Sequence, residues 1–433
     1  MAHADAPRGC FDAIVHRRLR AALPPIASRR CLEDMTFSAS DPASTSVPGF
    51  RRGRRISDLM TRDYHAFVES SLAAERAGDA ASALEYHQGV PMFRRSRHRV
   101  VLEQLVGLAE EMTPWLWARW AAYQCTRAED SGTESGAVGR VALDYTIRMF
   151  HGDDIAHAYE TGGDPVRVVA QVMGEDWVYH QVCTYELGGL DTFLDTMATG
   201  RLAEECALAR AWTDAGMGGY LLESAAPGQL VVRDLATDRP IDLLDLGAAV
   251  HADPGGWLVG RLVPSGTDPA LMFDTRPLPV DERTAAEVAR DRSRGAWIKA
   301  LADGIDAGRV DPAVLQSEDR ELVTDVSSIA LLERGTPPGA LAAARAALAE
   351  GRDEIGRAAF RVLRAVADGS FGGDEDAAYV AAAIVNAHAY AEARRLPARP
   401  EHRTAWERWA GLVPDPARGR LLRLAAVSGA SAA

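Results

Sequence analysis

Breaks between helical segments recur at nearly regular intervals through the first half of the 433-residue chain. Gly78-Asp79 interrupts one amphipathic segment, and further breaks follow at "EMTP" (111–114), "HGDD" (151–154) and "LGGLD" (187–191). The intervals of roughly 34 to 40 residues are typical of repeated helix pairs. Because each pair can bury its apolar face only against its neighbours, this spacing predicts three or four stacked helical hairpins over residues 59–217.

The first hairpin, at about residues 60–95, has the clearest signature. Gly78-Asp79 separates its two helical segments, Ala83 follows as a small packing residue, and Phe67 precedes as a large aromatic. In these features the segment resembles a tetratricopeptide repeat, whereas the later units share only the spacing of that family. The resemblance implies a scaffold that binds peptides or protein partners on a concave face.

Between residues 218 and 280 the pattern becomes strand-like. Short apolar runs such as "QLVVRDL" and "GWLVGRLVP" alternate with turn sequences such as "ATDRP" and "ADPG". Runs of this length between tight turns are typical of antiparallel strands. We therefore predict a small antiparallel β module in this part of the chain.

Helical periodicity returns over residues 281–433. Residues 376–395, "DAAYVAAAIVNAHAYAEARR", are apolar around almost the whole helix circumference, which predicts one central, buried helix. The predicted fold is therefore mainly α with a small antiparallel β module. It comprises a helical-hairpin array, the β module and a C-terminal helical domain.

Residues 1–58 contain proline, serine and arginine clusters without lasting periodicity. This pattern predicts a disordered basic leader, so a chain that starts at Met60 is expected to unfold at nearly the full-length temperature. The alternative is a basic arm that binds an acidic partner.

Charge and cysteine content limit the classes of partner. The net charge of -13 disfavours nucleic acids and anionic membranes. No apolar run has the length of a membrane span, and the five cysteines are dispersed without a CxxC pair. We therefore expect a cytoplasmic protein. The phosphate-loop and dinucleotide motifs are missing, so the sequence predicts no cofactor.

The sequence "HGDDIAHAYE" contains four residues of metal-ligating types. One helical face could present His157 together with Asp153 or Asp154, with His151 just before the helix. The alternative is that the aspartates cap the helix and favour its N-terminal end. The candidate metal ligands are His151, Asp153, Asp154 and His157.

Asp176, His180 and Cys183 follow one another at i, i+4 and i+7 on one helical face. A carboxylate can orient a histidine, and a histidine can activate a nearby thiol, so these three residues are the catalytic candidates. The alternative is a mixed core and surface without catalytic meaning.

A basic run, "RRSRHR", follows the first hairpin. It could contact nucleic-acid phosphates or an acidic protein, or it could be a solvated loop paired with local carboxylates. The candidate partner-binding residues are Arg94, Arg95, Arg97 and His98.

Three tryptophans lie close together in "PWLWARWAAYQC". Trp117 and Trp120 share one helical face, which we expect to pack on the preceding helix through Leu102, Leu105 and Leu108. The alternative is an aromatic face that stacks a ligand.

These features together favour a scaffold or adaptor that binds a protein partner through its helical-repeat surface. One alternative is a metal-assisted hydrolase that uses the His151–His157 region. Another is a nucleic-acid-associated regulator that uses the arginine-rich loop 94–99. The residues leave open whether the protein is an enzyme and whether it takes a small-molecule substrate.

Overall fold

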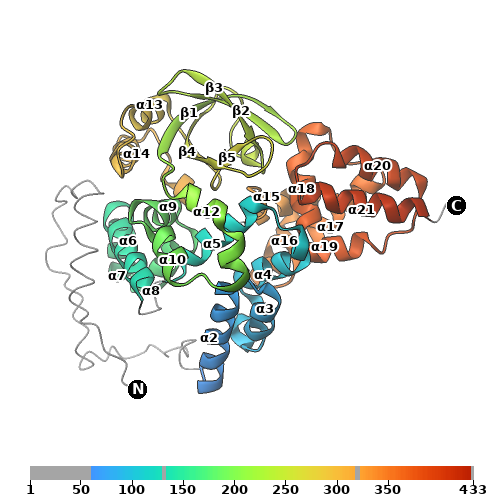
Figure 1. Ribbon diagram of the computed structural model, residues 1–433, viewed down its shortest axis with the longest axis horizontal. Coiled ribbons are helices and arrows are strands. Elements are labelled where there is room, and N and C mark those ends of the chain that lie inside the picture. Colours follow the sequence, from blue (N-terminus) through green and yellow to red (C-terminus); the bar gives the residue numbers. More distant parts are fainter. Residues whose placement is uncertain (1–59, 129–132, 317–321, 431–433) are drawn as a thin grey trace.

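The computed structural model describes residues 60–128, 133–316 and 322–430. The predicted leader at 1–58 therefore lies outside the described residues. The described part of the chain is mostly helical, and its one small sheet lies at an edge of the molecule with helices beneath and beside it (Figure 1). The prediction of a mainly α protein with a small β module is confirmed. None of the described helices combines the length and apolar character that a membrane span requires.

The first described elements form a helical hairpin, as predicted. Helix α2 (Arg62–Arg76) is followed by a turn in which Gly78 has a φ of +77°, a left-handed conformation that favours glycine. Asp79 then caps α3 (Ala80–Gln88), because its carboxylate accepts a hydrogen bond from the amide of Ser82 at 2.9 Å. The helix–turn–helix unit is thus present, and its assignment to the tetratricopeptide type stays a prediction.

The next helices form the central part of the molecule. They are α4 (Arg97–Leu108), α5 (Pro114–Thr126), α6 (Glu134–Phe150), α7 (Gly152–Glu160), α8 (Pro165–Glu175), α9 (Trp177–Gln181), α10 (Gly189–Thr196), α11 (Gly200–Glu205) and α12 (Ala207–Trp212). Helix α9 continues directly into a π-helical turn, Val182–Glu186.

Helix α5 lies at the centre of this group. The side chains of Trp115, Trp117 and Trp120 are at most 3% exposed, which supports their expected structural role. Helix α5 packs chiefly against α10, α11 and α12, whereas α4 packs against α3 and the C-terminal helices α18 and α19. Helix α5 therefore packs mainly on elements that follow much later in the chain, although His98 of α4 stacks on Tyr123 of α5.

Six strands form the sheet: β1 (Met217–Ala226), β2 (Gln229–Asp234), β3 (Arg239–Leu244), β4 (Trp257–Pro264), β5 (Leu271–Phe273) and β6 (Leu278–Val280). The first five close into a barrel in the order β1-β2-β3-β5-β4, with β4 pairing back to β1. The prediction of a simply antiparallel module is wrong, since β3 and β5 are parallel at Leu244 and Met272. Strand directions cannot alternate around a ring of five, so one pair in such a barrel must be parallel.

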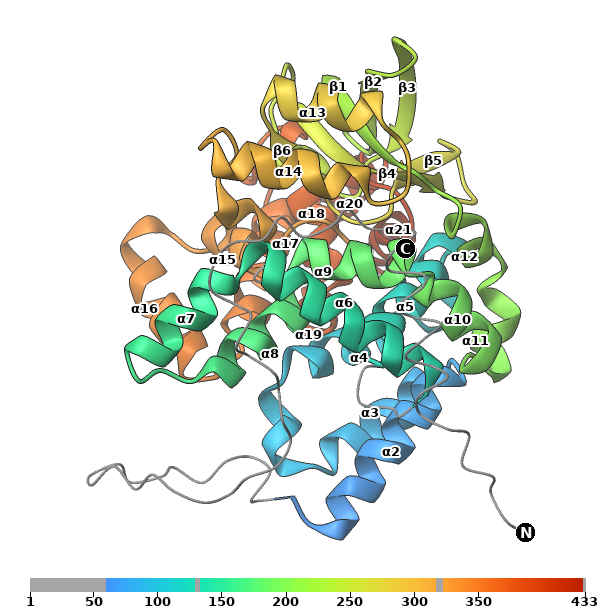
Figure 2. The same cartoon turned by 90° about the vertical axis from the view of Figure 1, so that its left-hand side faces the viewer.

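The remaining helices cover the barrel and build the C-terminal region. They are α13 (Glu282–Arg290), α14 (Ala296–Asp306), α15 (Ser328–Gly335), α16 (Pro338–Ala349), α17 (Glu354–Ala367), α18 (Ala377–Val385), α19 (Ala387–Ala393), α20 (Pro400–Ala410) and α21 (Ala417–Ala430). Figure 2 shows α13 and α14 against the outside of the barrel.

The single buried helix predicted at 376–395 is in fact two helices. Asn386 has an extended backbone, with φ -67° and ψ 121°, and ends α18. Its side chain then accepts a hydrogen bond from the amide of Ala389 at 3.0 Å and so caps α19. The apolar pattern predicted the burial of α18 correctly, and the capping preference of asparagine explains the break.

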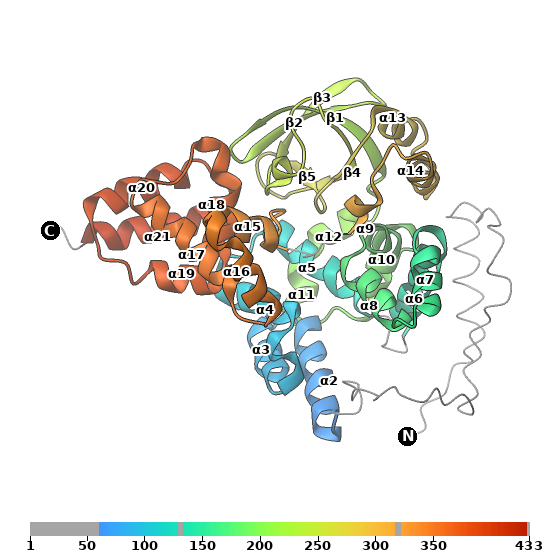
Figure 3. The ribbon, with the colours of Figure 1, turned by 180° about the vertical axis from the view of Figure 1, so that it is seen from behind.

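One hydrophobic core extends from Ala80 in the N-terminal hairpin to Ala425 in α21 and includes residues on the barrel wall. A smaller cluster around Leu222 and Val232 fills the barrel itself. Figure 3 shows the barrel above the junction between α5–α12 and the C-terminal helices. Side chains from all three regions therefore meet beneath the barrel.

Candidate functional site

His151, the first candidate metal ligand, lies between two carboxylates at the junction of α6 and α7. Its Nε2 lies 2.8 Å from a carboxylate oxygen of Asp176, and its Nδ1 lies 3.1 Å from one of Asp154. Burial alone would lower the pKa of His151, but hydrogen bonding and charge from Asp176 and Asp154 outweigh burial and raise it. Both ring nitrogens of His151 are thus already in contact with carboxylate oxygens.

Among the other candidate metal ligands, only Asp154 contacts His151 in the described part of the structure. Asp153, Asp154 and His157 are exposed on α7, whereas His151 is buried. Across residues 60–128, 133–316 and 322–430, no group of three or more histidine, cysteine, aspartate or glutamate side chains could hold a metal ion. The surroundings of His151 fit a charged hydrogen-bond network and do not fit a metal centre.

The three catalytic candidates share one helical segment, but Asp176 points away from His180. One carboxylate oxygen of Asp176 contacts His151, and the other accepts a hydrogen bond from the amide of Tyr179 at 2.6 Å. The Nε2 of His180 lies 3.0 Å from the carbonyl oxygen of Met173, and Cys183 is fully buried. Asp176 therefore orients His151, and the predicted Asp–His–Cys arrangement is not formed by these contacts.

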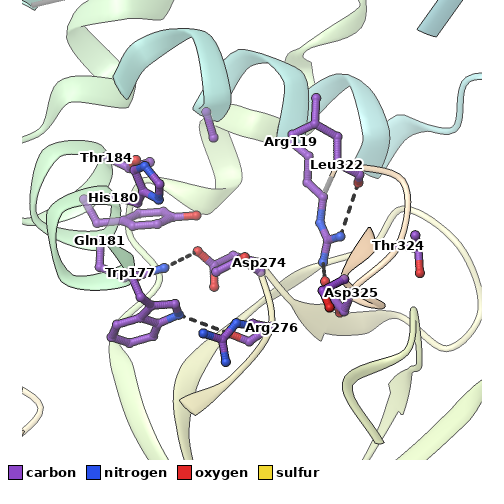
Figure 4. Close-up of a pocket in the computed structure, with 14 residues that line it drawn as sticks. Arg119, Trp177, His180, Gln181, Thr184, Asp274, Arg276, Leu322, Thr324 and Asp325 are labelled. Atoms are coloured by element: carbon purple, nitrogen blue, oxygen red, sulfur yellow. Dashed lines mark hydrogen bonds and ion pairs between the residues drawn. The ribbon is translucent and has the colours of Figure 1, made fainter. Parts of the chain in front are cut away.

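His180 instead borders a cavity of about 40 Å³ between the helical region and the barrel, which we call the seam pocket (Figure 4). Four elements meet there: α5, α9 with its π-helical turn, the β5–β6 connection and the segment 322–327. A π-helical turn is rare and often marks a functional site, because the extra residue in the turn changes the direction of the side chains. Besides His180, the charged and amide side chains that line the pocket are Arg119, Gln181, Asp274, Arg276 and Asp325.

Arg119 is 4% exposed and makes a buried ion pair with Asp325 at 3.0 Å. Its guanidinium also donates to the carbonyl oxygens of Leu322 and Phe273, at 3.2 and 3.1 Å. These bonds join α5 to β5 and to the segment 322–327. Arg119 therefore fixes one wall of the seam pocket.

Asp274 directly follows Phe273, at the start of the β5–β6 connection, and is 7% exposed. One carboxylate oxygen accepts a hydrogen bond from the Gln181 amide at 2.7 Å. The other, Oδ1, is buried and has no donor at hydrogen-bond distance among the described residues, although the nearby Tyr185 hydroxyl also favours the charged form. Burial raises the pKa of Asp274 more than Gln181 and the charge of Arg261 lower it.

Arg276 lies two residues further along the β5–β6 connection and is only partly buried. Its Nη2 donates to the carbonyl oxygens of Val314 and Gln316, at 2.8 and 3.1 Å. Burial lowers the pKa of Arg276, and Asp325 partly opposes this effect. With partly exposed Thr275 and Ser327, Arg276 marks the mouth of the seam pocket.

A second concave site contains two of the candidate partner-binding residues. It is a groove of about 760 Å³ between α4 and helices α15–α17, which we call the arginine groove. Ile329, Leu348 and Ile355 contribute apolar surface to its lining. The arginines that line it are Arg94, Arg97, Arg99, Arg345 and Arg352.

The other two candidates of the basic run differ in position. His98 is buried, with Nε2 2.9 Å from Glu75 and Nδ1 3.0 Å from the Tyr123 hydroxyl. It therefore belongs to the packing of α4 against α2 and α5 and does not line the arginine groove. The backbone of Arg95 lies in a short 3₁₀ helix, Pro91–Arg95, and its side chain lies outside the described part of the structure.

Sequence reasoning missed most of the residues that form these two sites. Arg119 could have been found, because one charge within the apolar segment "WLWARWAA" indicates a buried ion pair. Arg345 and Arg352 carry no such signal, since arginines on an exposed helix are common. They meet Arg94 and Arg97 only because the C-terminal helices pack beside α4.

No protein-family model, no curated protein sequence and no solved structure matches this chain.

Proposed function

We propose that this protein is a scaffold that binds an acidic segment of a protein partner in the arginine groove. The observation that supports this proposal is the convergence of five arginines from two distant parts of the chain on one concave surface. Helices α4 and α16 are separated by more than half of the sequence, so this cluster depends on the folded state.

Charge supports an acidic occupant. The protein carries a net charge of -13, whereas the lining of the groove contains five arginines and one carboxylate, Asp353. Such a patch steers an oppositely charged partner to one site and repels basic partners. Guanidinium groups also bind carboxylates in a two-pronged geometry that lysine cannot reproduce.

The ion pairs that these arginines make within the protein are mostly exposed and can exchange. Arg345 pairs with Glu333 and Arg352 pairs with Glu350, and each arginine side chain is more than half exposed. Exposed pairs of this kind typically contribute about 0–1 kcal/mol. An incoming carboxylate can therefore replace them at little cost. The apolar part of the lining would accept alternating apolar residues of the same segment.

The test is a titration with two labelled peptides, one of alternating glutamate and leucine and one in which lysine replaces glutamate. The acidic peptide should bind and the basic peptide should not. We expect the double variant Arg94→Glu/Arg345→Glu to bind the acidic peptide at least tenfold more weakly. Arg403→Glu is the matched control, because Arg403 is exposed on α20 and does not line the groove.

Two results would overturn the proposal. One is equal affinity of the double variant and the native protein for the acidic peptide. The other is tighter binding of a single-stranded RNA than of the peptide, which would favour the nucleic-acid regulator. A cytoplasmic location belongs to the same proposal and is supported by three buried free thiols, Cys125, Cys183 and Cys206.

A further inference from the structure

The seam pocket contains two opposite charges that lack a charged partner in direct contact. The neighbouring charges are accounted for by two ion pairs, in which Arg119 contacts Asp325 and the buried Arg261 contacts Glu186. Asp274 accepts a hydrogen bond from the neutral side chain of Gln181, and Arg276 donates to backbone carbonyls. Neither residue takes part in an ion pair among the described residues.

The two groups differ in depth. Asp274 is 93% buried, and its Oδ1 has no donor at hydrogen-bond distance in the described part of the chain. A buried polar atom in this state is costly unless a water or a ligand supplies the missing hydrogen bond. Arg276 is partly exposed at the mouth, and its Nε and Nη1 make no hydrogen bond with described residues. Arg276 is thus the more solvent-accessible of the two, and Figure 4 shows both among the side chains that line the pocket.

We propose that the seam pocket binds a small zwitterion, such as an α-amino acid with a small side chain. Its ammonium group would donate to Oδ1 of Asp274, and its carboxylate would accept from the free nitrogens of Arg276. This arrangement gives each unpaired charge an opposite charge and adds no net charge to the protein interior. It does not depend on the arginine groove, because the two sites have no lining residue in common.

The size of the pocket limits the ligand. Its volume of about 40 Å³ corresponds to roughly three water positions, at about 10–15 Å³ each. An ammonium group and one carbon atom fit such a space, while the carboxylate remains at the mouth. Among the lining hydroxyl groups, that of Thr324 already bonds Leu246 and Val326, so Thr184 is the one proposed to accept an ammonium hydrogen. Ligands with a bulky cationic group do not fit this interior.

The experiment compares glycine and L-alanine with three analogues by isothermal titration calorimetry on the full-length protein. Acetate lacks the ammonium group, methylammonium lacks the carboxylate, and glycine betaine has three methyl groups in place of the ammonium hydrogens. Glycine or alanine should bind saturably and raise the melting temperature, since a ligand that binds only the folded state stabilises it. Each analogue should bind at least tenfold more weakly.

Variants then locate the site. Arg276→Gln should weaken glycine binding at least tenfold, and Arg276→Lys should weaken it less, because lysine keeps the charge but not the planar donor geometry. Asp274→Asn should also weaken binding at least tenfold. Arg283→Gln is the control, since Arg283 is exposed on α13 and does not line the pocket.

The outcomes separate the alternatives. If Asp274→Asn fails to fold, the partly exposed Arg276 still decides the question. Absence of saturable binding, equal affinities for glycine and acetate, or unchanged glycine affinity in Arg276→Gln would each overturn the proposal. In that case the pocket would be a hydrated polar junction between α5, α9 and the barrel.

Discussion

Two histidines in the helical region respond in opposite ways to their surroundings. His151 lies between two carboxylates, which raise its pKa. His87 stacks on Phe93. Burial and the charges of His98 and Arg127 lower the pKa of His87 to about 4. Carboxylate neighbours therefore favour the protonated form of His151, whereas burial and nearby positive charges favour the neutral form of His87.

His151→Gln should destabilise the protein mainly at lower pH. Because the pKa of His151 is raised in the folded state, its protonation stabilises the folded protein fully at pH values below the unfolded-state pKa of about 6.5. This stabilisation is lost as the pH rises through the folded-state pKa. We expect a loss of about 2 kcal/mol near pH 6 and a smaller loss near pH 9, measured by urea denaturation. A loss that is equal at both pH values would show that the protonated form of His151 does not contribute.

Glu75→Gln should show the opposite pH dependence. Burial alone would raise the pKa of Glu75, but the charges of Arg127 and His98 and their hydrogen bonds lower it to about 2. A lowered pKa gives stability that is present above the unfolded value of about 4.3 and is lost as the pH falls toward 2. We expect the variant to lose about 3 kcal/mol at neutral pH, because Arg127 and His98 lose their buried partner.

The control for this prediction is the same denaturation at acid pH. The difference between the native protein and Glu75→Gln should shrink steadily below pH 4 and nearly vanish only at about pH 2 or below. A constant difference between pH 3 and pH 7 would contradict the assigned ion pairs.

At the scale of elements, α5 shows what periodicity can and cannot predict. Its apolar pattern correctly indicated that Trp117 and Trp120 are structural, because large side chains at helical spacing usually fill a core. The neighbours of α5 could not be predicted in this way. Periodicity identifies the buried face of a helix, but α10, α11 and α12 lie more than 60 residues further along the chain.

Trp120→Ala should lower stability by about 3–5 kcal/mol, since it leaves a large cavity in the core. The indole nitrogen of Trp120 has no hydrogen-bond partner among the described residues. Trp120→Phe therefore removes fewer packing contacts and no hydrogen bond, and it should lower the free energy of unfolding clearly less than Trp120→Ala does. Chemical denaturation of the two variants measures the difference. A near-native midpoint for Trp120→Ala would instead support the ligand-stacking alternative.

The barrel strands should be strongly protected from hydrogen exchange. We expect slow exchange in "LVVRDL" (230–235) and "WLVGRLV" (257–263), whose strands pair on both sides. In the turn 252–256, the amides of Gly255 and Gly256 donate hydrogen bonds to Leu222 and Asp253, so fast exchange should be confined to Ala252 and Asp253. Mass spectrometry of deuterated fragments checks this pattern, and fast exchange throughout both strands would contradict the barrel.

At the scale of the whole molecule, the sequence divisions at 217 and 281 do not separate independent cores. The main core includes residues from the hairpins, the barrel wall and the C-terminal helices, from Ala80 to Ala425. Arg420 is fully buried and donates to the carbonyl oxygens of Ile384 and Val385, and its charge faces Glu111 of the central region at 3.5 Å. The predicted domains therefore share much of their buried surface.

This shared core predicts a single cooperative unfolding transition for the residues that the structure describes. Differential scanning calorimetry should show one peak whose van't Hoff and calorimetric enthalpies agree. Arg420→Met should keep one peak and lower its midpoint. Two well-separated peaks in the native protein would show that the sequence divisions are independent folding units.

The order of the main regions could be predicted from the sequence, because helical and strand periodicities change abruptly near residues 218 and 281. The parallel pair β3–β5 and the break at Asn386 could not, since each depends on pairing or capping that a local pattern does not specify. The sites were hardest to predict. Asp274 and Arg276 are close in sequence, but the pocket between them and Arg119 exists only where α5 meets the barrel.

The end of α2, just before the turn at Gly78, contacts the start of α11, which lies far away in the sequence. At the end of α2, the carbonyl oxygen of Arg76 accepts a hydrogen bond from the amide of Thr199 at 2.8 Å, although the two residues are 123 positions apart. The carbonyl oxygen of Ala77 accepts one from the amide of Leu202 at 3.4 Å. The negative C-terminal end of the α2 dipole thus faces the positive N-terminal end of the α11 dipole, as two successive turns of a single helix do. A Cβ atom at Gly78 would lie 2.6 Å from the amide nitrogen of Leu202. Asparagine, which tolerates a positive φ, would therefore satisfy the turn and still separate the two helix ends.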